Sequence, residues 1–163
     1  MRAGPLIIAV ILLLPTGARA DKPMTINVSQ LTMGTAVTMA EAAIAACRER
    51  GIEASVTIVD RDGIPQVSLR DTLAPPLSLV VSRKKAYTAA MFRVNGSVLE
   101  AHGTHAPLAT IGAGLAFSAG SVPIAVGGKF YGAIGVSGAP QGTTDEQCAA
   151  AGLKSIRTDL EMQ

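Results

Sequence analysis

The two histidines of this chain, His102 and His105, lie only three positions apart. A neutral imidazole nitrogen is a common protein ligand for transition metals, so one or both side chains could bind a metal ion. Gly103 and Pro107 favour a loop over a continuous helix for this segment. Taken alone, the pattern favours a surface loop with two solvated histidines over a metal site.

The basic cluster of the chain is Arg83, Lys84 and Lys85, and Tyr87 follows it closely. If the segment is helical, three consecutive side chains spread over about 200° and cannot all face one partner. One or two of them could bind an anionic group such as a carboxylate. The alternative is a solvated helix face whose long side chains lie along apolar surface.

Cys47 and Cys148 are the only cysteines and lie far apart in the chain, which excludes a thioredoxin-type centre and a cysteine-rich zinc site. We expect Cys47 near the end of the first helix and Cys148 near the start of the last helix. If these helices pack antiparallel, the two residues lie at the same level and could form a disulfide. The alternative is that each is a small core residue.

Two other patterns resemble functional motifs. Asp60 and Asp62 could begin a metal-binding loop, but further oxygen ligands at fixed spacing are missing, so Asp62-Gly63 indicates a hairpin turn. Gly135-Val-Ser-Gly-Ala139 resembles the nucleophile turn of a hydrolase, but it ends in alanine and both histidines precede its serine. The sequence contains no nucleophile–base constellation that would identify an enzyme.

Hydrophobic periodicity predicts the elements that position these residues. A helix is expected after an N-cap at Ser29, with a buried stripe from Met33 to Cys47. The other predicted helices are 78–93, 98–101 and 145–156, and the predicted strands are 54–60, 66–70 and two or three short strands within 111–137. Pro123 indicates an edge strand. The order α-ββ-α-α-βββ-α predicts a single α+β domain with a central antiparallel sheet flanked by helices.

The first 20 residues resemble a secretory signal peptide, with an apolar run at 6–14 and a small-residue cleavage site near Ala20. The run is shorter than the roughly 20 residues of a membrane-spanning helix, although a permanent anchor is the alternative. We therefore expect a signal peptide at 1–20, a domain at 21–163, and export to the periplasm or the extracellular space. An oxidising compartment would allow Cys47 and Cys148 to pair.

The composition excludes several classes of protein. The chain has 163 residues, of which 48% are hydrophobic and 3% aromatic, and its formal charge is +2, so it is not intrinsically disordered. Its 17 glycines and 9 prolines exclude a long coiled coil. Because the leader holds two arginines and no acid, the remaining chain has equal numbers of basic and acidic side chains, and no nucleic-acid partner is expected.

Four segments occur in the order typical of one known family: 56–63, 83–90, 128–138 and 145–152. From about Thr25 to Ile156 the chain resembles the GlcG/HbpS family of small haem-binding domains, especially its secreted HbpS-like members. It departs from the family at Ala119-Gly-Ser-Val-Pro123, where members commonly carry Gly-Gly-x-Pro. The resemblance implies an α+β fold that assembles into dimers and larger rings, often octamers.

The resemblance also implies haem binding, with a corrinoid as another ligand, and a role in haem or redox sensing, sometimes through a membrane sensor protein. A small-molecule enzyme, a haem-degrading protein and a cofactor-free accessory subunit remain alternatives. A haem site needs an apolar slot, an iron ligand and cations for two propionates. The candidate residues are His102, His105, Arg83, Lys84, Lys85 and Tyr87.

The iron ligand is expected to be His102 or His105, with His105 preferred because Pro107 stiffens its loop. Tyr87, Tyr131 or a methionine could bind the iron instead. Since few aromatic residues are available to enclose a porphyrin, we expect a shallow site at a subunit interface.

Overall fold

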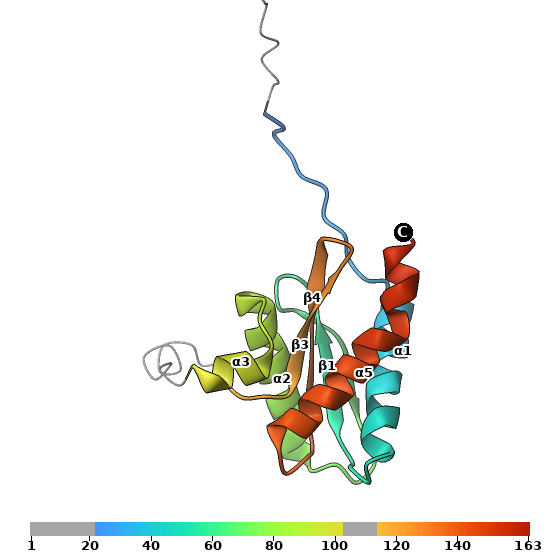
Figure 1. Cartoon of the computed structure of the whole chain (residues 1–163), viewed down its shortest axis with the longest axis vertical. Coiled ribbons are helices and arrows are strands. Elements are labelled where there is room, and N and C mark those ends of the chain that lie inside the picture. Colours follow the sequence, from blue (N-terminus) through green and yellow to red (C-terminus); the bar gives the residue numbers. More distant parts are fainter. Residues whose placement is uncertain (1–21, 103–113) are drawn as a thin grey trace, which may run out of the picture.

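A computed structural model describes residues 22–102 and 114–163, and the elements of this part of the chain are shown in Figure 1. In chain order they are α1 (Met33–Arg48), β1 (Ser55–Val59), β2 (Pro65–Arg70), α2 (Pro76–Phe92), α3 (Gly96–Ala101), β3 (Ser121–Val126), β4 (Lys129–Ser137) and α5 (Gly142–Glu161). This arrangement confirms the predicted α+β domain. In the described ranges, none of the helices is long and apolar enough to cross a membrane. The predicted signal peptide lies outside these ranges.

The four strands form an antiparallel sheet in the order β2-β1-β4-β3. The central strand β1 pairs with both β2 and β4, and all five of its residues are buried. β3 forms one edge, as Pro123 predicted, because proline has no N–H to donate to a further strand. Of the two or three strands expected within 111–137, residues 114–137 contain β3 and β4.

The turn between β1 and β2 is built around Asp60. Its Oδ1 accepts hydrogen bonds from the backbone N–H groups of Asp62 and Ile64, both at 2.9 Å. Gly63 follows with φ of 79°, a left-handed conformation that glycine adopts without steric cost. Asp60 therefore has the turn role that the sequence favoured over a metal loop.

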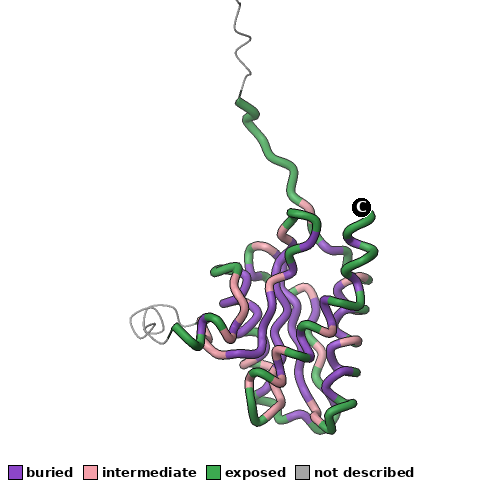
Figure 2. Tube along the Cα trace, in the orientation of Figure 1, coloured by how far each residue is buried: buried purple, intermediate pink, exposed green. Residues whose placement is uncertain are grey.

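Helices cover both faces of the sheet (Figure 1), with α1 and α5 on one side and α2 and α3 on the other. The larger core lies between the sheet and the pair α1 and α5. The α2 side is packed through small residues, chiefly Ala86, Ala89 and Ala133. A Cβ added to Gly135 would lie 2.5 Å from Ala86 N, so glycine at this position allows α2 to lie directly on β4. Figure 2 shows the resulting burial of the strands.

A disulfide joins Cys47, at the end of α1, to Cys148, in the first half of α5. Their Cα atoms are 5.5 Å apart, and both residues are completely buried. The bond therefore holds together the two helices that enclose the larger core.

Two helix boundaries differ from the sequence expectation. α1 is capped by Thr32 rather than Ser29, because Thr32 Oγ1 accepts a hydrogen bond from Thr35 N at 3.2 Å. Met33 is consequently in the first turn and is 73% exposed instead of part of the buried stripe. α5 begins at Gly142 rather than at Asp145, and the Asp145 side chain is buried against other elements.

Candidate functional site

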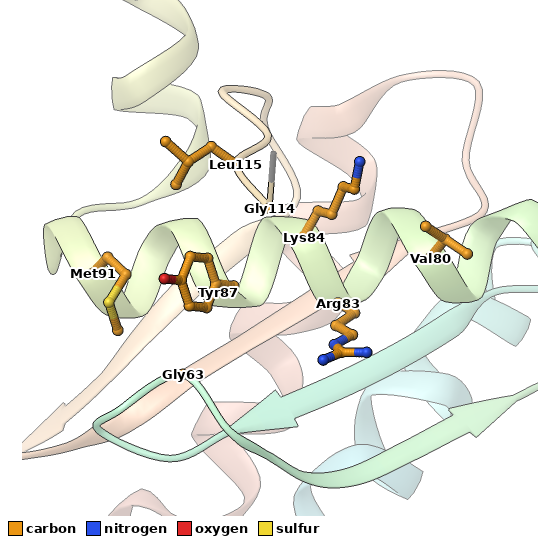
Figure 3. A pocket seen from close by; sticks show the side chains of 8 residues that line it. All are labelled: Gly63, Val80, Arg83, Lys84, Tyr87, Met91, Gly114 and Leu115. Carbon is orange, nitrogen blue, oxygen red and sulfur yellow. The ribbon is translucent and has the colours of Figure 1, made fainter. Parts of the chain in front are cut away.

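A cavity of about 510 Å³ opens along one side of α2 (Figure 3). Most of its lining residues share one face of α2, and two further segments complete the lining. The lining residues are Val80, Arg83, Lys84, Tyr87 and Met91 from α2, Gly63 from the β1–β2 turn, and Gly114 and Leu115 from the segment before β3. The volume is in the range of cavities that bind small molecules and cofactors.

The cavity combines apolar surface with two cations. Val80 is 52% exposed and Met91 is 40% exposed, so both side chains remain accessible to a ligand. Arg83 and Lys84 lie beside them, and neither forms a salt bridge within the described ranges. Such an arrangement suits a flat apolar ligand that carries carboxylates at one edge.

Tyr87 is positioned by two glycines. A Cβ added to Gly63 would lie 2.7 Å from Tyr87 Cε2, so a side chain there would displace the ring. A Cβ on Gly114 would lie 3.7 Å from the other edge of the same ring, which is ordinary contact distance. The ring is therefore held between the β1–β2 turn and the segment before β3.

Thr88 connects α2 to the segment before β3, which forms one wall of the cavity. Its Oγ1 accepts a hydrogen bond from Ala116 N at 2.8 Å and donates one to Lys84 O at 2.8 Å. Phe92 and Phe117 add an edge-to-face contact with ring centroids 5.5 Å apart. These contacts join the segment before β3 to α2, which carries the two cations. The two sides of the cavity are therefore fixed relative to one another.

The structure separates Lys85 from its two basic neighbours, as the helical spacing required. Lys85 Nζ is 3.0 Å from Asp145 Oδ2, and the two side chains are 5% and 2% exposed. Asp145 also accepts a hydrogen bond from Ala139 N at 2.9 Å. Burial raises the pKa of the Asp145 carboxyl, while Ala139 N–H and Lys85 oppose that shift. Lys85 therefore does not line the cavity.

The histidines are not among the described lining residues. His102 is exposed at the end of α3, and its Nδ1 lies 2.7 Å from Val98 O. His105 lies outside the described residues. Tyr131, the other tyrosine considered as an iron ligand, is 4% exposed and belongs to the larger core. Among the described residues, the predicted iron ligands that line the cavity are Tyr87 and, since a methionine was the other alternative, Met91.

The sequence analysis did not identify which methionine could bind iron, and it did not identify the two glycines beside Tyr87. Met91 follows Tyr87 by four positions, which places both on one helical face. That spacing was readable in the sequence. The closeness of Gly63 to Tyr87 was not, because it depends on how the β1–β2 turn meets α2.

The lining residues fit a haem group by their chemistry. Val80, Leu115 and the Tyr87 ring offer apolar surface, and Arg83 and Lys84 offer charge for propionates. Arginine and protonated lysine have no lone pair for a metal, so the described lining side chains able to bind iron are Tyr87 and Met91.

A second cavity of about 430 Å³ lies on the other side of the sheet, between α1 and β2. Its wall includes Glu41, Arg48, Arg70 and Asp71. Arg48 donates two hydrogen bonds to Asp71, at 2.7 and 2.6 Å, and thereby lowers the pKa of that carboxyl. Because charges of both signs dominate this wall, it suits an apolar tetrapyrrole less well than the α2 cavity.

Comparison with known proteins identifies several similar chains. Residues 31–154 match the family model described as "Haem degrading protein HbpS-like". The crystal structure of HbpS has 35% sequence identity, covers 84% of this chain and 97% of its own, and superposes with a TM-score of 0.76. A double mutant of Streptomyces reticuli HbpS has 32% identity, covers 96% of this chain and 99% of its own, with a TM-score of 0.76.

A more distant structure shares the fold. The PduOC:heme complex has 20% identity, covers 78% of this chain and 96% of its own, and has a TM-score of 0.72. No curated protein matched the sequence.

Proposed function

Because the chain belongs to the GlcG/HbpS-like family, we propose that it binds haem in the α2 cavity. One observation carries this proposal: a single helical face presents apolar surface, two cations and two side chains with donor atoms suited to iron to the same cavity. The fold is compatible with such a ligand, since PduOC has been solved as a heme complex. A corrinoid is the other tetrapyrrole to test.

Each lining residue has a distinct role in this proposal. Arg83 and Lys84 bind the two propionates through charge-assisted hydrogen bonds. Val80 and Leu115 contact the macrocycle and exclude water from it. Bound haem would supply an iron centre with redox and ligand-binding chemistry. Lys85, in contrast, acts by holding α2 in place.

A hemin titration of the chain from Asp21 onward tests the proposal. We expect a Soret band that saturates, and we expect the Arg83→Ala/Lys84→Ala variant to bind more weakly without a shift of the band. Lys154→Ala is the matched control, because Lys154 is exposed on α5 away from the lining residues. Equal affinity in the wild type and the double variant would show that these cations do not hold the ligand.

The iron ligand requires a separate comparison. His105 and His102 stay predicted ligands, while the described cavity offers Tyr87 and Met91. If a histidine binds the iron, the His102→Ala/His105→Ala variant will shift the Soret maximum. If Tyr87 or Met91 binds it, the same variant will keep the wild-type spectrum.

Haem degradation is a second candidate function, because the family model that matches residues 31–154 carries that description. Incubation with hemin, a reductant and dissolved oxygen distinguishes it from binding alone, because oxygen is the oxidant that opens the porphyrin ring. A degrading enzyme would destroy the Soret band and release iron, with an open-chain product detectable by mass spectrometry. A binding protein would keep haem that can be extracted intact.

Export is part of the proposal. The signal-like sequence at 1–20 and the Cys47–Cys148 disulfide both suit a protein that folds in an oxidising compartment. We expect the mature protein to begin near Asp21 and to appear in the periplasmic or extracellular fraction. Haem or redox sensing through a membrane sensor protein would require a stable contact with that protein. Co-purification of such a partner from membranes tests this contact.

Self-association completes the proposal. Leu77 of α2 is 69% exposed, and Val80, which lines the cavity, is 52% exposed. A second copy packed here would cover this apolar surface and the open side of the haem site. Light scattering should give a dimer or a larger ring, up to an octamer. A monomer mass at micromolar concentration would contradict this part of the proposal.

A further inference from the structure

Tyr87 and Met91 lie one helical turn apart on the face of α2 that lines the cavity, and Figure 3 shows the Tyr87 hydroxyl pointing towards Met91. Both side chains lie close to the backbone of Gly63. A Cβ added to Gly63 would be 2.7 Å from Tyr87 Cε2 and 3.2 Å from Met91 Cε. The Tyr87 ring and the end of the Met91 side chain therefore lie at the same end of the cavity, beside Gly63.

These two donors prefer different oxidation states of iron. A tyrosine phenolate is a hard, anionic ligand of the kind that holds ferric haem in catalase. A methionine thioether is a soft, neutral ligand and raises the reduction potential of haem in cytochromes c, which means that it favours the ferrous state. The described lining contains both kinds of donor.

The two side chains also differ in mobility. The Tyr87 ring lies between Gly63 and Gly114, so its position is fixed by backbone on both sides. Met91 is 40% exposed and has three rotatable bonds, so its sulfur can adopt several positions at the mouth of the cavity. A mobile sulfur donor that lies beside a fixed oxygen donor can replace that oxygen as the ligand of one metal ion.

We propose that Tyr87 and Met91 form a ligand pair that makes the cavity respond to the oxidation state of haem iron. This inference rests on the proposed function. Tyr87 Oη binds Fe(III) as a phenolate. When a one-electron reductant, such as a reduced flavin or iron–sulfur protein, converts Fe(III) to Fe(II), the iron–oxygen bond breaks and Tyr87 Oη takes up one proton from solvent. Met91 Sδ then binds Fe(II), and neither side chain is itself oxidised or reduced.

The test measures dissociation constants for hemin and for dithionite-reduced haem under argon, in the wild type, Tyr87→Phe and Met91→Leu. Both substitutions nearly conserve volume, so the fold should tolerate them. We expect Tyr87→Phe to weaken ferric binding about tenfold or more, to abolish the phenolate charge-transfer absorption, and to leave ferrous binding nearly unchanged. Met91→Leu should show the reverse pattern, with the loss confined to the ferrous state.

Equal losses in both oxidation states for either variant would mean that the side chain serves as wall alone, and would overturn the inference. Circular dichroism and thermal unfolding that match the wild type exclude misfolding as the cause. If hemin binds and depends on Arg83 and Lys84 while the Tyr87→Phe spectrum is unchanged, the proposed function stands and this inference fails. If the wild type does not bind hemin, both fail.

Discussion

Lys85 Nζ lies 3.0 Å from Asp145 Oδ2, in a buried ion pair that ties the middle of α2 to the first turn of α5. Lys84, the preceding residue, lines the cavity from a neighbouring face of the same helix, about 100° around its axis. The pair therefore helps to fix the rotation of α2 about its axis. With Lys85 directed inward, Arg83, Lys84 and Tyr87 are directed to the cavity.

Removing one member of this pair should destabilise the protein strongly. Lys85→Met leaves the Asp145 charge buried without its partner, and we expect a loss of about 3–5 kcal/mol in the free energy of unfolding. Urea unfolding measures it. The Lys85→Met/Asp145→Leu double variant should recover much of the loss, because it removes both charges. A single variant as stable as the wild type would contradict the structural role of the pair.

The Arg48–Asp71 pair should make stability depend on pH. Arg48 lowers the pKa of the folded-state Asp71 carboxyl, so the stabilisation is present above the ordinary carboxyl pKa and is lost as the pH falls through the folded-state value. The stability difference between the wild type and Arg48→Met should therefore be largest near neutral pH and shrink below about pH 4.

Arg157→Met is the matched control for that measurement. Arg157 and Glu161 are both about half exposed, with 3.8 Å between the charged atoms. An exposed pair of this kind contributes little, so the control should change stability slightly at any pH. A pH-independent difference for Arg48→Met would show that Arg48 acts through packing.

The Cys47–Cys148 disulfide should contribute much of the stability. Replacing both residues by alanine is expected to lower the free energy of unfolding by about 2–5 kcal/mol, because the unfolded chain loses a long-range cross-link. Urea unfolding of the oxidised wild type and the double variant measures this difference. Detection of two free thiols in unfolded, non-reduced protein would contradict the bond.

Gly63→Ala should reduce haem binding by displacing Tyr87. A Cβ there collides with the tyrosine ring, and the φ of 79° adds backbone strain. Gly127→Ala is the control, since Gly127 has φ of 57° but no atom within 4 Å of an added Cβ. Backbone strain should cost each variant about 1–2 kcal/mol of stability, the collision should add to that loss in Gly63→Ala, and Gly63→Ala alone should bind hemin more weakly. Equal affinities would mean that the Tyr87 position does not matter for binding.

The parts of the fold that depend on local signals were predictable. Alternation along 54–60 and the Asp62-Gly63 turn indicated the β1–β2 hairpin, because strand periodicity and turn chemistry act within a few residues. Pro123 indicated an edge strand for the same reason. The caps were less predictable: Ser29 and Thr32 are both favourable N-cap residues by type, and only the structure shows that Thr32 Oγ1 accepts the capping hydrogen bond from Thr35 N.

The candidate site was predictable only in part. Helical spacing showed that Arg83, Lys84 and Lys85 could not share one face, but it could not say which of them turned inward. That choice depends on Asp145, which is 60 residues away in the chain. The histidines were proposed as ligands because they are the only two imidazoles in the chain, and that fact carries no information about their position in space. The described cavity is built from α2, Gly63 and the segment before β3.

The most direct test of the central claim, that haem binds in the α2 cavity, is a hemin titration of two tryptophan variants beside the wild type. Val80→Trp places a large ring in the cavity, while Met33→Trp makes the same kind of change at an exposed position of α1, on the other side of the sheet and outside the lining. We expect a saturable Soret band for the wild type and Met33→Trp, and a strongly weakened one for Val80→Trp. Wild-type affinity in Val80→Trp, or no Soret band in the wild type, would contradict haem binding in this cavity.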